Sequence, residues 1–158
     1  MRIAFAALML SLAAASGTVS AQDDKKALEP VQGTWIVVGV VDNGEEAPKI
    51  GLEAGNFKWT IKDDQATFVQ LNVARYYSFV LDPTKSPPSI DMTITKMEYE
   101  GKEIPKAAGK VFRGIYEVKD DVLRICVRED SQDSERPSEF TSPKGSKIVV
   151  FTLERARP

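Results

Sequence analysis

The stretch Phe57-Lys58-Trp59-Thr60-Ile61-Lys62 alternates large apolar side chains with polar or charged ones. Successive side chains of an extended strand point to opposite faces, so one face here is apolar and the other is solvated. Asp63-Asp64 follows at once and reads as a turn. The stretch therefore predicts a half-buried β-strand whose Trp59 packs in a core, which we favour over a role in stacking on a ligand.

Short strands and turns continue on both sides of this stretch. Residues 35–41 are apolar and rich in β-branched side chains, and they end at the turn signal Asp42-Asn43-Gly44. Pro48 and Pro105 interrupt the two segments that could otherwise be helical. The other candidate strands are residues 66–73, 75–81, 90–95, 111–118, 122–127 and 147–153. About eight strands at this spacing predict an all-β fold, either a sandwich or a closed barrel.

The composition limits the chemistry that the chain can perform. Its 158 residues are 42% hydrophobic and 28% charged, which is typical of one globular domain. Lys and Arg number 21 against 23 Asp and Glu, so the chain lacks the basic surface typical of nucleic-acid binding. It has no His and one Cys, so the commonest general base, an intrachain disulfide and a thiolate metal cage are all missing. We expect no cofactor, no bound metal and no nucleic-acid partner.

The first residues predict an export signal. Met1-Arg2 precedes an apolar run over residues 3–15, and small residues end at Val19-Ser20-Ala21. This order is typical of a secretory signal peptide, and the run is shorter than the ~20 residues that cross a bilayer. We expect the mature chain to lie in the periplasm or outside the cell, without a transmembrane segment. The predicted parts are a signal peptide over 1–21, a flexible tail over 22–29 and a β domain over 30–156.

Four stretches carry a resemblance. They are Gln32-Gly33-Thr34-Trp35; Leu81-Asp82-Pro83-Thr84-Lys85 with Ile90-Asp91-Met92-Thr93; Gly114-Ile115-Tyr116-Glu117 with Leu123-Arg124-Ile125-Cys126; and Arg136-Pro137-Ser138-Glu139-Phe140. In this order they resemble a family of uncharacterised secreted domains known from planctomycete bacteria. The Gly-x-Trp of the first stretch also resembles the N-terminal signature of lipocalins.

The resemblance covers about residues 28–154 and implies a lipocalin-like, up-and-down antiparallel β-barrel of about eight strands. It implies a structural signature of Gly33, Trp35 and Arg155. The Trp of such a barrel packs at its closed end beneath a basic side chain of the last strand, which here would be Arg155.

A small closed barrel can hold one ligand in its lumen. Adjacent Tyr76 and Tyr77 face opposite sides, so at most one of them points inward. Arg124 alternates with apolar neighbours, so it lies either on a solvated face or inside the cavity, facing an anionic head group. The candidate ligand-binding residues are Tyr77, Arg113, Tyr116 and Arg124.

The fold predicts function only by analogy. We expect an exported, non-enzymatic protein that binds a small apolar or amphipathic ligand. One alternative is a module that binds another protein or the cell envelope and whose barrel is filled by side chains. The other is a carboxylate-dependent hydrolase. Cys126 has no His to activate it, so we expect it to be buried rather than catalytic.

Overall fold

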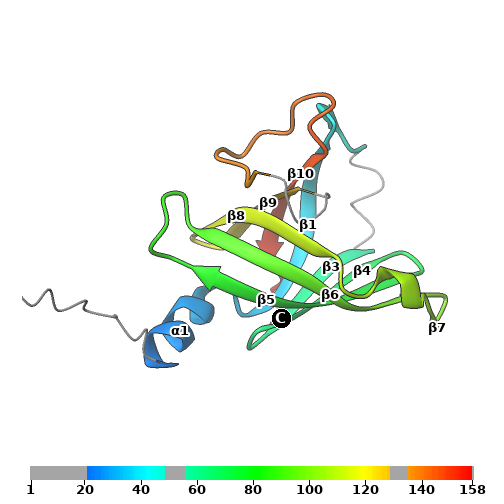
Figure 1. Cartoon of the computed structure of the whole chain (residues 1–158), viewed down its shortest axis with the longest axis horizontal. Coiled ribbons are helices and arrows are strands. Elements are labelled where there is room, and N and C mark those ends of the chain that lie inside the picture. The colour runs from blue at the N-terminus through cyan, green and yellow to red at the C-terminus, as the bar shows by residue number, and fades with distance from the viewer. Residues whose placement is uncertain (1–20, 49–55, 129–134, 158) are drawn as a thin grey trace, which may run out of the picture.

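The structure is a computed structural model that describes residues 21–48, 56–128 and 135–157. The predicted signal peptide, apart from Ala21, lies outside the described residues. In the described parts of the chain, antiparallel strands dominate (Figure 1). No helix there has the length and apolar character needed to cross a bilayer.

Within the described residues, eight long strands close into one barrel. They are β1 (Gly33–Asp42), β3 (Phe57–Lys62), β4 (Gln65–Gln70), β5 (Val73–Asp82), β6 (Ser89–Tyr99), β8 (Val111–Lys119), β9 (Val122–Arg128) and β10 (Ile148–Arg155). The short strands β2 (Glu45–Glu46) and β7 (Lys102–Glu103) pair with β1 and β6. Neighbours along the chain pair in turn, and β10 pairs back with β1. The predicted antiparallel barrel is confirmed, and the sandwich alternative is wrong.

The strands form where the side chains alternate, and they end where the backbone turns. β3 has the predicted bounds. β4 ends at Gln70, earlier than predicted, because Leu71 adopts a positive φ of 51° and begins a turn. β6 runs to Tyr99, beyond its predicted end, because the turn at Glu100 folds β7 back onto it.

The N-terminal segment closes one end of the barrel. Residues 22–29, predicted as a flexible tail, hold helix α1 (Ala21–Leu28) and the first residue of the 3-10 helix η1 (Glu29–Val31). Leu28 packs against the core, and Val31 is buried. Figure 1 shows α1 and β7 at opposite ends of the molecule. Because Leu28 and Val31 pack into the barrel there, the end near α1 is the closed one.

The main core lies inside the barrel. Trp35 and Trp59 are both buried there, as the alternation predicts. A smaller apolar cluster lies on the outer wall, where Ile115, Cys126 and Val150 are buried under Phe140. The outer faces of β8, β9 and β10 are therefore covered locally by the segment that follows β9.

Candidate ligand-binding cavity

The barrel contains a cavity of about 580 Å³. Its lining residues come from the end of β1, the beginnings of β3, β8 and β10, and the middle of the sheet between them. This places the cavity at the end opposite Val31 and Trp35. Its volume falls in the range of ~300–1,000 Å³ that is typical of pockets for small molecules.

The cavity wall is mainly aromatic. Trp59 stacks on Phe68 and on Tyr77, with ring centroids 4.9 and 5.4 Å apart. Phe151 meets Trp59 edge-on at 6.1 Å, and Phe112 meets Tyr77 in the same way at 6.2 Å. These rings come from five different strands, so the wall is held by the sheet itself.

Few polar groups reach this apolar space. Arg75 is half-buried, and its Nη1 donates a hydrogen bond of 3.2 Å to Oε1 of Gln70. Its guanidinium carbon lies 5.7 Å from the centre of the Phe68 ring. Asp42 also lines the cavity, but it is exposed at the end of β1. Among the described residues, no carboxylate forms an ion pair with Arg75.

The two indole N–H groups differ. Nε1 of Trp35 donates a hydrogen bond of 2.8 Å to the carbonyl oxygen of Val31. Nε1 of Trp59 is buried and finds no acceptor among the described residues. Buried donors are nearly always satisfied in proteins, so Nε1 of Trp59 is an exception among the described residues.

The structure brings only one of the four candidate ligand-binding residues to the cavity. Tyr77 lines it. Tyr116 also points into the barrel but lies near the closed end with Val31, where burial raises the pKa of its phenol. Arg113 is exposed on the outer wall, and Arg124 is on the outer face of β9.

The prediction of Arg124 inside the cavity is wrong. Leu123 and Ile125 take the inner face of β9, so Arg124 between them must point outward. There its Nη1 lies 2.8 Å from Oε1 of Glu117, and its guanidinium stacks over Phe140 at 4.5 Å. Sequence reasoning missed Arg75. Its signal was the alternation on β5, because Arg75 shares a face with Tyr77.

The closed end carries the three signature residues. The guanidinium of Arg155 lies 4.1 Å from the centre of the Trp35 ring. It donates hydrogen bonds of 2.7 Å to the carbonyl oxygen of Gln32 and 3.0 Å to that of Pro30. Gly33 has a φ of 112°, and an added Cβ would lie 3.2 Å from Nη1 of Arg155. These contacts hold the start of β1 against the end of β10, so the role of the three residues is structural.

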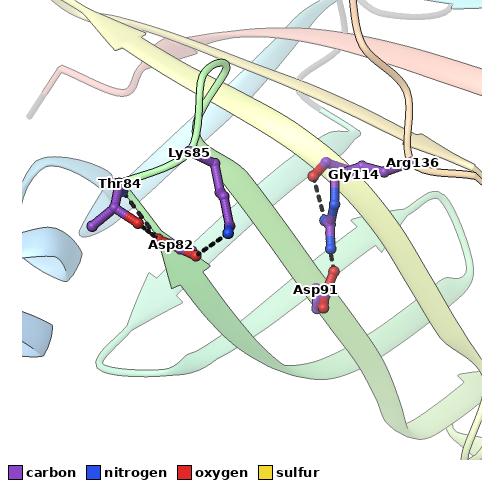
Figure 2. A network of polar contacts seen from close by, with 6 residues as sticks. All are labelled: Asp82, Thr84, Lys85, Asp91, Gly114 and Arg136. Atoms are coloured by element: carbon purple, nitrogen blue, oxygen red, sulfur yellow. Dashed lines mark hydrogen bonds and ion pairs between the residues drawn. The ribbon is translucent and has the colours of Figure 1, made fainter. Parts of the chain in front are cut away.

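A second hollow, of about 500 Å³, lies on the outer wall. Figure 2 shows Arg136 reaching over β8 to β6 beside it. Nη1 of Arg136 donates hydrogen bonds of 2.7 and 3.0 Å to the carbonyl oxygens of Gly114 and Ile90, and lies 2.7 Å from Oδ1 of Asp91. Hydrogen bonds from Thr84 lower the pKa of the nearby Asp82 carboxyl. The contacts of Arg136 attach the chain after β9 to the barrel, so the role of this cluster is structural.

Three of the four stretches that carry the family resemblance meet at these contacts of Arg136.

The chain was also compared with protein-family profiles, with curated proteins and with solved structures, and none of these comparisons finds a match. The fold and the side-chain geometry therefore carry the functional argument.

The one cysteine lies outside the cavity. Cys126 is fully buried on the outer face of β9, and its Sγ donates to the carbonyl oxygen of Glu139 at 3.4 Å. Burial raises the pKa of this thiol to about 11, against the lowering effect of Arg124. The described residues bring together no group of His, Cys, Asp and Glu that could hold a metal ion.

Proposed function

We propose that this protein is an exported, non-enzymatic, lipocalin-like barrel that binds one small apolar or amphipathic ligand in its cavity. The observation that carries the proposal is the cavity of about 580 Å³ with aromatic walls inside a closed barrel. The same open space supports ligand binding over the alternative of a module whose barrel is filled by side chains.

Two observations support a binding function over catalysis. Glycoside hydrolysis requires two carboxyl groups that face one another, and Asp42 is the only carboxylate among the described residues that line the cavity. The Cys126 thiol is buried and stays protonated at neutral pH, so it is a poor nucleophile.

The proposal includes export and membership of the secreted planctomycete-type family. The basic start, the apolar run and Val19-Ser20-Ala21 support export. The barrel and the contact of Arg136 with Asp91 and Gly114 support the family resemblance, since they give three of its stretches a common structural purpose.

Calorimetric titration with 1-dodecanol tests the binding function, with native mass spectrometry to count bound molecules. We expect saturable binding of one molecule and a change in Trp59 fluorescence. Val40→Phe, which fills part of the cavity, should weaken binding. Val38→Phe is the matched control, because Val38 is exposed on the same strand. Absence of saturable binding to the wild-type protein would contradict the proposal.

A further inference from the structure

We infer that the ligand is a carboxylic acid with an apolar tail, and that its carboxylate binds Arg75 and Gln70. This inference rests on the proposed function and names the chemical class of its ligand. Its basis is the unusual position of Arg75 compared with the other half-buried arginines of the barrel.

Arg75 is a fixed positive charge in an apolar space. It is half-buried on the inner face of β5, in the cavity wall with Phe68 and Tyr77. A guanidinium that is removed from water needs hydrogen-bond acceptors, and above all an anion, to offset its lost hydration. The described residues give it one hydrogen bond, to Gln70, and the face of the Phe68 ring.

Three other half-buried arginines of this barrel have a carboxylate partner. Arg124 lies 2.8 Å from Glu117, Arg136 lies 2.7 Å from Asp91, and Arg155 lies 3.3 Å from Asp121. A fourth, Arg128, donates instead, among the described residues, to the backbone carbonyl oxygens of Glu135 and Ser146. Among the described residues Arg75 has neither a carboxylate partner nor several carbonyl acceptors, and it is the one of these five that lines the cavity. A ligand carboxylate would supply the missing anion.

Asp42 does not replace that anion. It is the acidic residue of the cavity lining, but it is exposed at the end of β1, where water and salt screen its charge. It forms no ion pair with Arg75 in the part of the chain that the structure describes.

The donors present fit a carboxylate. A guanidinium offers parallel N–H groups that match the two oxygens of a carboxylate. The Gln70 amide can turn its NH₂ toward the ligand, because Asn and Gln amides both donate and accept. The remaining aromatic lining suits a hydrocarbon tail.

General electrostatic attraction cannot produce a preference for acids. The whole chain carries a formal net charge of −2, which repels anions at long range. If this protein binds an acid more tightly than an alcohol of equal length, a positive group must therefore lie close to the ligand. In the cavity that group is Arg75.

Laurate, 1-dodecanol and dodecylamine share one chain length and differ in charge, so calorimetric titration with all three tests the inference. At neutral pH we expect the wild-type protein to bind laurate at least about tenfold more tightly than 1-dodecanol, and dodecylamine most weakly. Arg75→Gln should reduce the laurate preference to about one, and Arg75→Lys should keep part of it. Arg113→Gln, on the exposed outer wall, should leave the preference unchanged.

Equal binding of laurate and 1-dodecanol to the wild-type protein would overturn the inference and leave the proposed function standing. Retention of the full laurate preference in Arg75→Gln would also overturn it. If circular dichroism shows that Arg75→Gln does not fold, the test rests on two other results. These are the order in which the wild-type protein binds the three ligands and the size of the laurate preference in Arg75→Lys. Failure of the wild-type protein to bind any of the three ligands would refute the proposed function together with the inference.

Discussion

At the scale of single residues, Gly114 shows how closely β8 and β9 approach one another. A Cβ at this position would overlap the carbonyl oxygen of Cys126 and Cγ1 of Val127 on the neighbouring strand. The carbonyl oxygen of Gly114 accepts a hydrogen bond of 2.7 Å from Nη1 of Arg136. Glycine is therefore required here by a close approach of two strands and not by a positive φ.

We predict that Gly114→Ala destabilises the protein by about 1–3 kcal/mol, because overlap with backbone atoms forces two strands apart. Gly39→Ala is the matched control on β1, since its Cβ would lie 3.5 Å from Cβ of Thr152, in ordinary contact. Urea unfolding of both variants measures the difference. Equal stability of the two variants would contradict this account of Gly114.

Because of Cys126, the stability of the protein decreases at alkaline pH. Burial raises the pKa of its thiol to about 11 from an ordinary 9.0. The unfolded chain ionises this thiol near pH 9, whereas the folded chain keeps it protonated until about pH 11. The contribution of the buried, protonated thiol to the free energy of unfolding is therefore fully present below pH 9 and is lost as the pH rises from 9 to 11.

We predict that the free energy of unfolding of the wild-type protein falls toward that of Cys126→Ala across this range, by roughly 2–3 kcal/mol. Both proteins carry the same Lys and Tyr residues, so their difference isolates the thiol. Denaturant unfolding at several pH values gives the two curves, and a constant difference from pH 8 to 11 would disprove the assignment.

At the scale of elements, the chain after β9 acts as an outer cover. Phe140 packs on Ile115, Cys126 and Val150, and Arg136 fastens the same segment to β6 and β8 (Figure 2). The cover therefore shields the thiol, and the exposure of Cys126 reports whether the segment is attached.

We predict that Arg136→Gln speeds alkylation of native Cys126 about tenfold or more, since it removes charged hydrogen bonds worth ~1.5–3 kcal/mol each and favours local opening. Arg113→Gln is the control, because Arg113 is exposed on β8. Timed reaction with iodoacetamide under native conditions measures the rate. An unchanged rate in Arg136→Gln would show that Arg136 does not hold the cover.

At the scale of the whole molecule, closure of the barrel creates the cavity. The pairing of β1 with β10 runs from Trp35 opposite Arg155 to Asp42 opposite Val149 and joins the two ends of the domain. A register shift between Val37 and Gly39 accommodates the bend. Ligand binding should thus stabilise the whole closed barrel rather than one segment.

We predict that laurate at about a hundredfold excess over its Kd raises the stability of the wild-type protein by ~2.7 kcal/mol, since it binds only the folded state. For a chain of this size that corresponds to a Tm increase of roughly 5–10 °C, measured by scanning calorimetry. Val40→Phe should show a smaller increase at the same laurate concentration. A shift of equal size in both proteins would place the ligand outside the cavity.

Barrel closure was an expectation from the resemblance alone. The sequence by itself determined most of the strands, the all-β fold class, and the burial of Trp35 and Trp59. These follow from a two-residue alternation that each strand carries locally. The same alternation could have identified Arg75, because it lies on one face with Tyr77, and it already allowed Arg124 to lie on the outer face.

Only the tertiary structure decided which face of each strand points inward along its length and where the cavity opens. It also decided that Arg136 meets Asp91 and that Arg75 stands without a carboxylate partner among the described residues. Local alternation fixes which side chains share a face, but closure of the sheet through β1 and β10 chooses the inner face. Contacts between residues so distant in sequence then depend on that closed geometry, which no single strand encodes.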